Sequence, residues 1–288
     1  MARPGKWISA GAAALAFALV AAGCGGDDSS GTNSASASKG GGSAPAPIAG
    51  AGKITACMDV SFPPMEYFES AGSRKPVGFD VDLISAIAKE WGVTPQFSQT
   101  SFDGLLPALS GGRCDVVASG IFVTSERTAT FPAVPYYKSR RVLLVRQGNP
   151  EGIKSLDDLS GKTAATQVAT EYEKTLRKLD KDLKAQGKPG ITIQTYPKAS
   201  DAVQQLVVGR AVAVYTQDTE AAFRSKAQPG QFEIAYADPS AETFGIYLRK
   251  DQAQLGTGLK SAVDKMRQDG SLAEIAKRWG LPESGTDL

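Results

Sequence analysis

The sequence predicts an α/β fold of two lobes, each a mainly parallel sheet flanked by helices, joined by a hinge of two chain segments. Strand-like and helix-like patterns alternate over residues 53–145 and again over residues 146–238. An extended segment separates these two halves, and residues 239–288 are expected to return to the first lobe. Alternation of strand and helix implies right-handed crossovers and parallel strands, so a cleft between the lobes is expected.

The first 23 residues have the layout of a secretory signal peptide. Arg3 and Lys6 precede an apolar run, residues 7–22, that is short for a membrane span. Residues 1–23 are therefore expected to be removed.

Small residues precede the first cysteine. Val20-Ala-Ala-Gly-Cys24 resembles the bacterial lipobox, in which the Cys is diacylated, although a typical lipobox has Leu in place of Ala21. We expect Cys24 to anchor the protein by lipid on the extracytoplasmic side of the cell membrane; an ordinary secretory signal and an uncleaved anchor are the alternatives. Residues 24–52 are mainly Gly, Ser, Ala and Pro and predict a flexible tether.

Charge and composition narrow the class of protein. Loss of residues 1–23 removes Arg3 and Lys6 and no acidic residue, so the formal charge falls from +2 to about zero. A neutral surface of mixed charge argues against nucleic acid as a partner. The chain has no His, which removes the usual zinc ligand and the usual general base. We expect a monomer without cofactor or metal.

Two further cysteines, Cys57 and Cys114, lie in apolar strand-like runs. We expect buried thiols, because Cys57 is near the end of its strand and Cys114 at the start of another. This offset argues against a disulfide.

The first lobe is predicted from short apolar runs that alternate with helical spacing. For example, Val81, Ile84, Ala88 and Trp91 recur at helical intervals, and Gly92 ends the pattern. Strands are predicted at 53–58, 93–98 and 116–118, helices at 81–91 and 101–109, and an extended crossing segment at 136–146.

The second lobe repeats the pattern. Thr170-Glu-Tyr-Glu173 is a capping box that opens a charged amphipathic helix. Strands are predicted at 163–167, 191–196 and 211–215, with a helix at 200–208; the chain then returns through a strand at 244–248 and helices at 259–269 and 273–279.

One stretch combines features of an anion site. Ser119-Gly120 follows the strand at 116–118, and Thr124 is placed to cap a helix that contains Arg127. A guanidinium beside free backbone N–H groups suits a carboxylate. The alternative is that Arg127 is a surface residue of an ordinary helix.

Several motifs occur in a characteristic order between Lys53 and Leu281. They are Asp59-x-x-Phe-Pro-Pro-Met, Gly78-Phe-Asp-Val-Asp-Leu, Phe102-Asp-Gly-Leu-Leu-Pro-Ala-Leu, Gly112-Arg-Cys-Asp, Thr124-x-x-Arg127, Ser155-Leu-Asp-Asp-Leu-x-Gly-Lys162 and Ile275-Ala-Lys-Arg-Trp-Gly280. Together they resemble the extracytoplasmic solute-binding proteins of ABC importers, in the polar amino acid branch (bacterial solute-binding protein family 3). The resemblance implies a two-lobed periplasmic-binding-protein-like fold that captures a solute and delivers it to an ABC transporter permease.

The resemblance also implies a site in the cleft. Arg127 would bind the α-carboxylate of the ligand, assisted by backbone amides near Ser119, Gly120 and Phe122 and at the helix that begins at Thr170. Aromatic rings would sandwich the ligand, and a carboxylate would meet its distal group; the positions concerned are Phe62, Phe102 and Asp59.

Two positions depart from the family pattern. Phe122 stands where Ser or Thr is usual, and Gln217 stands where an Asp binds the α-ammonium, although Asp218 is adjacent. We therefore expect a carboxylate zwitterion with an unusual cation, ectoine-like or betaine-like, held in an aromatic box. The alternatives are an ordinary amino acid held by Asp59, Glu171 or Asp218, and a Phe122 that packs in the core.

A binding protein is the expected class, and an enzyme is not. The rival is a cleft enzyme resembling cyclohexadienyl dehydratases, in which Glu66, Glu171 and Asp59 would supply acid and base groups. A ligand-sensing subunit of a receptor is the third possibility.

Overall fold

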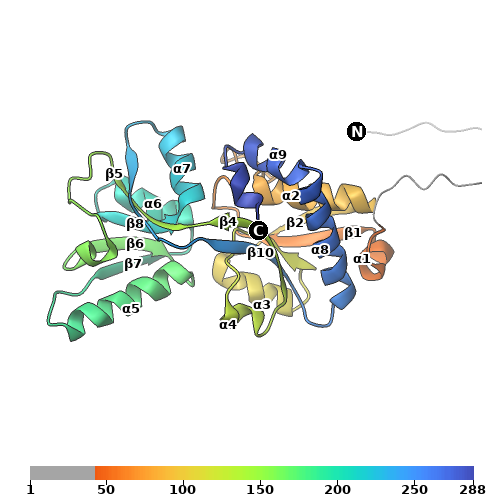
Figure 1. The fold of residues 1–288 in the computed structure, drawn as a ribbon, viewed down its shortest axis with the longest axis horizontal. Coiled ribbons are helices and arrows are strands. Elements are labelled where there is room, and N and C mark those ends of the chain that lie inside the picture. Colours follow the sequence, from red (N-terminus) through yellow and green to blue (C-terminus); the bar gives the residue numbers. More distant parts are fainter. Residues whose placement is uncertain (1–42) are drawn as a thin grey trace, which may run out of the picture. The chain divides into compact units, whose positions relative to one another are not determined.

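The structure, a computed structural model, describes residues 43–288. These residues form two lobes, each built on a five-stranded sheet (Figure 1). The expected signal peptide, Cys24 and most of the expected tether lie outside the described residues. No helix within residues 43–288 has both the length and the apolar character that crossing a bilayer requires.

The sheet of the first lobe has the strand order β2-β1-β3-β10-β4. Strand β1 is parallel to both of its neighbours, whereas β10 is antiparallel to both of its own. The strands are β1 (Lys53–Met58), β2 (Thr94–Gln99), β3 (Val116–Val117), β4 (Ala133–Ser139) and β10 (Glu242–Leu248). The helices of this lobe are α2 (Phe79–Trp91), η1 (Phe102–Gly104), α3 (Leu105–Ser110), α4 (Ser125–Thr128), α8 (Ala253–Gln268), α9 (Ser271–Arg278) and η3 (Glu283–Thr286).

The sheet of the second lobe repeats this arrangement in the order β7-β6-β8-β5-β9. Here β6 is parallel to both neighbours and β5 is antiparallel to both. The strands are β5 (Arg141–Arg146), β6 (Thr163–Gln167), β7 (Thr192–Tyr196), β8 (Ala213–Gln217) and β9 (Phe232–Ala237). The helices are η2 (Leu156–Leu159), α5 (Glu171–Ala185), α6 (Ala199–Val207) and α7 (Asp218–Ala227).

The two-lobed α/β class with mainly parallel sheets is as predicted: in each sheet four strands run in one direction and a single strand, β10 or β5, runs against them. The antiparallel strands come from the two chain segments that connect the lobes. One segment runs from β4 through Arg140 into β5, and the other runs from β9 into β10. Residues 141–145, which were expected to belong to the first lobe, pair with β8 and β9 and therefore belong to the second sheet.

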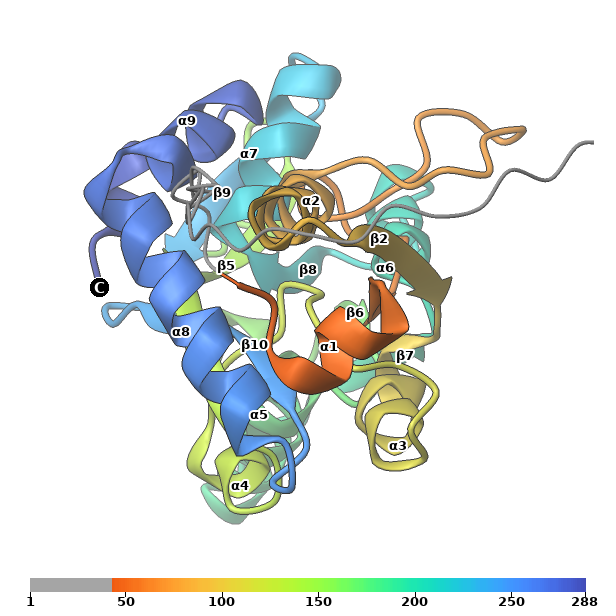
Figure 2. The same cartoon turned by 90° about the vertical axis from the view of Figure 1, so that its right-hand side faces the viewer.

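The expected tether is shorter than predicted. Helix α1 (Ala46–Ala51) lies within it, with Pro45 at its start and Ile48 buried in the core. This helix lies beside α8 (Figure 2), where a Cβ on Gly258 would meet the ring of Pro45 at 2.6 Å. Burial of the Ile48 side chain thus packs helix α1 against the first lobe, although the composition of this segment resembles that of a linker.

The loop between β1 and α2 is fixed from its C-terminal end by Gly78. This residue has φ 139°, and a Cβ there would lie 2.1 Å from the carbonyl oxygen of Met65. Only glycine permits so close an approach of the two backbones. The contact positions residues 60–68, which carry part of the site described below.

Cys57 and Cys114 form a disulfide, which corrects the expectation of two buried thiols. Their Cα atoms are 5.7 Å apart, a normal distance for a bridge. Cys114 precedes β3 in a loop that lies against β1, where Asp115 accepts a hydrogen bond from the backbone of Thr55 at 2.7 Å. Because β3 is only two residues long, the expected strand offset does not separate the cysteines.

Candidate ligand-binding site

A cavity lies where the parallel strands of the two sheets end. The residues that follow β1 and β3 face those at the ends of β6 and β8, and ligands of α/β proteins bind at such carboxyl ends. The lining residues are Asp59, Phe62, Glu66, Phe102, Ser119, Gly120, Gln167, Thr170, Tyr172, Ala199, Ala202, Val214, Tyr215, Thr216, Gln217 and Glu220.

Asp59 is the carboxylate at the end of β1. Its backbone N–H donates to the hydroxyl of Ser119 at 2.9 Å, and its carboxylate accepts from the side-chain amide of Gln167 in the other lobe. The residue is only 6 % exposed, and this burial raises the pKa of Asp59 to about 6. A buried carboxylate bonded only to neutral groups favours a cation as its partner.

Two further carboxyl groups, Glu66 and Asp80, lie beneath the Ser119-Gly120 turn. Glu66 accepts from the Ser119 hydroxyl at 2.8 Å, while Asp80 accepts from the Gly120 N–H at 2.7 Å and from the hydroxyl of Tyr136 at 2.8 Å. Burial raises the pKa of Glu66 well above its ordinary value, and the negative charge of Asp80 raises it further. Of the two buried carboxyl groups, Glu66 is therefore the one expected to keep a proton at neutral pH.

Replacing Glu66 tests this protonation state. We expect Glu66→Gln to change the free energy of unfolding by less than about 1 kcal/mol, because a neutral amide replaces a neutral carboxyl group of the same shape and still accepts from Ser119. Glu66→Ala leaves the buried Ser119 hydroxyl without its acceptor and opens a cavity, and is expected to cost about 3 kcal/mol. Urea denaturation at neutral pH measures both values. A Gln variant as unstable as the Ala variant would show that Glu66 is ionised.

Aromatic rings cover several sides of the cavity: Phe62, Phe102, Tyr172 and Tyr215. Gly120, at φ 50°, brings the backbone against the first of them, since a Cβ there would lie 2.7 Å from the Phe62 ring. Rings of this kind offer their faces to organic cations.

Three buried polar atoms in the cavity wall have no hydrogen-bond partner among the described residues. They are one carboxyl oxygen of Glu66, the hydroxyl of Tyr172 and the amide oxygen of Gln217, whose amide nitrogen donates to the Gly120 carbonyl at 3.0 Å. Buried polar atoms are normally paired, so all three are candidates for bonds to a bound solute. The Gln217 oxygen accepts only, and thus requires a donor.

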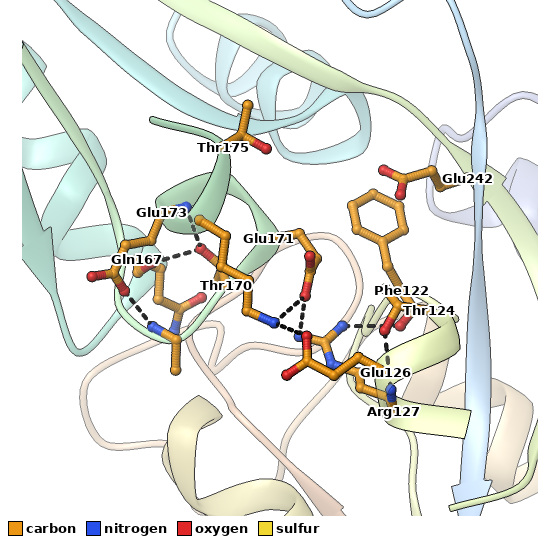
Figure 3. Close-up of polar contacts among 12 residues, drawn as sticks. Phe122, Thr124, Glu126, Arg127, Gln167, Thr170, Glu171, Glu173, Thr175 and Glu242 are labelled. Atoms are coloured by element: carbon orange, nitrogen blue, oxygen red, sulfur yellow. Dashed lines mark hydrogen bonds and ion pairs between the residues drawn. The ribbon is translucent and has the colours of Figure 1, made fainter. Parts of the chain in front are cut away.

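Arg127 lies beside the cavity and not in its wall. Thr124 caps the short helix α4 by accepting from the Arg127 backbone N–H at 3.3 Å. The guanidinium donates to the Phe122 carbonyl at 2.9 Å, lies over the ring of Phe102 at 5.9 Å and pairs with Glu171 at 3.5 Å. Figure 3 shows the Glu171 carboxylate directed at this guanidinium from the start of α5.

The structure gathers most of the predicted ligand-binding residues around the cavity. Those that line it are Asp59, Phe62, Phe102, Ser119, Gly120, Thr170 and Gln217. Four others do not line it: Phe122, Arg127, Glu171 and Asp218.

Two of these four have clear alternative roles. Phe122 is 3 % exposed and packs against Tyr172 and Phe244, with the guanidinium of Arg141 5.7 Å from its ring centre. Its contacts are those of a core residue, one of the two alternatives that the sequence left open. Asp218 accepts from the hydroxyl of Ser139 at 2.6 Å, next to the segment that connects the lobes.

Sequence reasoning missed several cavity residues in the second lobe: Gln167, Tyr172, Tyr215, Thr216 and Glu220. Of these residues, Gln167 could most readily have been recognised from the sequence, because it is polar and ends a predicted strand. Glu220 is fully buried, accepts from the Thr216 hydroxyl at 2.6 Å and pairs with Arg224 at 3.1 Å. Nothing in the sequence marks a helical Glu as part of the cavity wall.

Two lobes that enclose a polar and aromatic cavity at their strand ends define a solute-binding protein of the two-lobed type. Residues 54–282 match the bacterial extracellular solute-binding proteins, family 3, and the chain belongs to this family. The family predicted from the motifs is thereby confirmed.

Three individual proteins illustrate this similarity. The L-cystine-binding protein TcyJ of Escherichia coli (strain K12) is 29 % identical over 229 residues, which cover 79 % of this chain and 82 % of TcyJ. The crystal structure of the P235GK mutant of ArgBP from T. maritima has a TM-score of 0.73 at 30 % identity, covering 81 % of this chain and 97 % of that chain. The ancestral amino acid-binding protein AncCDT-1, a precursor of cyclohexadienyl dehydratase, has a TM-score of 0.72 at 29 % identity, covering 81 % of this chain and 98 % of that chain.

Proposed function

We propose that this protein is anchored by a lipid on Cys24 at the extracytoplasmic side of the cell membrane, captures a polar amino acid or a related zwitterion, and delivers it to an ABC permease as a monomer. The observation that carries the proposal is the cavity between the lobes, lined by Asp59, aromatic rings and unpaired polar atoms. Membership of the solute-binding family supports the transport role.

The chemistry of the cavity favours a solute with a cationic group. Asp59 supplies a buried negative charge, while Phe62 and Phe102 supply ring faces for a weakly hydrated cation. TcyJ is an L-cystine-binding protein, and another structure of ArgBP from T. maritima is arginine-bound; both amino acids carry an α-ammonium group. The ectoine-like and betaine-like solutes expected from the sequence carry a cation as well, so they belong in the same test.

Both lobes contribute to holding the solute. Gln167 and Gln217 of the second lobe reach Asp59 and Gly120 of the first. Ligand contacts made by both lobes favour the closed arrangement, which a permease is proposed to recognise.

Thermal unfolding of the purified protein tests the proposal with arginine, lysine, histidine, glutamine, cystine, ectoine and glycine betaine. A true ligand at a hundred times its dissociation constant is expected to stabilise the fold by about 2.7 kcal/mol. Isothermal titration then gives the affinity. If no member of the panel shifts the transition, capture of an amino acid or related zwitterion is refuted.

A second candidate function is catalysis, which the likeness to AncCDT-1 favours together with the pKa of about 6 for Asp59. Chemical analysis of a solute after prolonged incubation with the protein separates the two. A binding protein returns the solute unchanged, whereas a dehydratase converts a cyclohexadienyl acid into an aromatic product.

A further inference from the structure

The hydroxyl group of Tyr172 belongs to the cavity wall and forms no hydrogen bond within the protein. Tyr172 lies in the first turn of α5 and is 5 % exposed, and its hydroxyl has no partner among residues 43–288. Four other residues of the wall carry a hydroxyl group, and each donates a hydrogen bond within the protein: Ser119, Thr170, Tyr215 and Thr216. Because buried hydroxyl groups are normally paired, the hydroxyl of Tyr172 is expected to bind a partner from outside the chain.

This hydroxyl is a hydrogen-bond donor. Burial raises the pKa of Tyr172 well above its ordinary value, and the negative charge of Glu220 raises it further. The phenol therefore keeps its proton at neutral pH, and its O–H group needs an acceptor. Gln217 supplies the complementary group in the same wall, because its unpaired amide oxygen needs a donor.

Two aromatic rings, one from each lobe, hold the ring of Tyr172. Tyr215 of β8 meets it edge to face with 5.7 Å between the ring centres, and Phe122 of the first lobe meets it edge to face at 6.1 Å. Edge-to-face contact at such distances is a preferred arrangement of aromatic pairs. Phe122 packs in turn on Phe244 at 5.0 Å. The direction of the Tyr172 hydroxyl thus depends on a residue of the other lobe.

We propose that Tyr172 is a solute-binding residue of this cavity, that its hydroxyl donates a hydrogen bond to an oxygen acceptor of the solute, and that Phe122 positions it. The proposal rests on the proposed function and narrows it, because the solute must present a carboxylate, carboxamide or carbonyl oxygen toward α5. It also gives Phe122 two separate tasks: its carbonyl accepts from Arg127, and its ring packs on Tyr172.

The variant Tyr172→Phe removes the hydroxyl and keeps the ring. Isothermal titration uses those members of the panel above that bind the wild type, since all of them carry a carboxylate. We expect the Kd to rise by about 30-fold, because a hydrogen bond to a charged acceptor is lost. The Tm without solute should stay within about 1 °C of the wild type, since the hydroxyl has no partner in the protein.

The variant Tyr215→Phe is the matched control from the same wall. It removes a hydroxyl that donates to Asp238 at 2.8 Å and keeps the ring against Tyr172. The opposite result is expected: the Tm without solute falls by about 3 °C, because a bond within the protein is lost, and the Kd stays within about twofold.

The role of Phe122 is tested by combining two substitutions. Phe122→Leu keeps the backbone carbonyl and an apolar side chain but removes the aromatic contact with Tyr172. We expect it to raise the Kd by about fivefold in the wild type and by less than about twofold in Tyr172→Phe, where no hydroxyl is left to position. An equal effect in both backgrounds would overturn the positioning role, since it would show only a general change of shape.

The possible failures are distinguishable. If no member of the panel binds the wild type, the proposed function fails and this inference fails with it. If the wild type binds but Tyr172→Phe binds equally tightly, or if Tyr215→Phe weakens binding as much, the proposed function stands and the role of the Tyr172 hydroxyl is overturned. A lower Tm of Tyr172→Phe with unchanged affinity also overturns it, because the hydroxyl would then be paired inside the protein.

Discussion

The double variant Cys57→Ala/Cys114→Ala is expected to lower the free energy of unfolding by about 4 kcal/mol. The disulfide joins residues 57 positions apart in the sequence, and such a link removes conformations that the unfolded chain would otherwise sample. Both cysteines are buried beside Val117 and Leu109, so the bond also ties β1 to the loop that follows α3. Urea denaturation of the oxidised protein and of the variant measures the difference.

The wild-type protein treated with a reductant provides the control. It is expected to unfold at nearly the same urea concentration as the double variant, because both lack the link but keep almost the same core. An unchanged midpoint after reduction, or two free thiols in the untreated unfolded protein, would contradict the prediction. A disulfide also agrees with an extracytoplasmic setting, since such bonds persist in oxidising compartments.

The sequence could not reveal this disulfide, because its geometry depends on register. The sequence places Cys114 at the start of the strand predicted at 116–118 and Cys57 near the end of its own strand, which predicts a large offset between them. The strand begins only at Val116, and the preceding loop lies against β1 through Asp115 and Thr55. These are tertiary contacts, which no local pattern encodes.

Strand and helix patterns were reliable where they were strong. The strands at 53–58 and 163–167 lie where the sequence places them, because each is a buried strand beside a clear turn. Helix α7 and strand β9 were not predicted. Helix α7 has little separation between apolar and polar faces, and β9 is an edge strand that is only partly buried, so neither has a distinct periodicity.

The site residues likewise divide into those that a local sequence pattern reveals and those that depend on tertiary contacts. Residues that end strands, such as Asp59 and Gln217, could be found because a polar residue after an apolar run is visible in the sequence. The pairing of Arg127 with Glu171 joins the two lobes and depends on how they meet. A motif match assigns Arg127 to a ligand but contains no information about the ion pair with Glu171, 44 positions later in the chain.

Asp59→Asn is expected to make the empty protein more stable and its binding weaker. The pKa of Asp59 rises from 3.8 to about 6 on folding, because burial disfavours the charged form. The folded state therefore binds this proton more tightly than the unfolded state does, so stability falls as the pH rises from about 4 to about 6. At pH 8 the buried charge costs about 3 kcal/mol, which the neutral Asn does not incur. Below about pH 4 the two proteins should be equally stable, because both side chains are neutral.

The same substitution should weaken binding of a cationic solute by about a hundredfold at pH 8, since it removes a buried, charge-assisted partner. Wild-type affinity is expected to rise as the pH increases through about 6, whereas the variant should show no such rise. The groups that face Asp59 from neighbouring elements are Ser61, Glu66, Gln167, Lys198 and Glu220, and all of them are retained in the variant. The pH dependence that is lost can therefore be assigned to Asp59 itself.

Urea denaturation and isothermal titration at pH 4, 6 and 8 separate a binding role from a purely structural one. If Asp59 served only folding, its replacement would make the protein less stable. If its buried charge serves a ligand, that charge lowers the stability of the ligand-free protein, and its replacement makes this protein more stable. A variant that is less stable at pH 8, or one that binds the solute as tightly as the wild type, would remove Asp59 from the site. A gain in stability with a loss of affinity would identify its carboxylate as the group around which the solute is held.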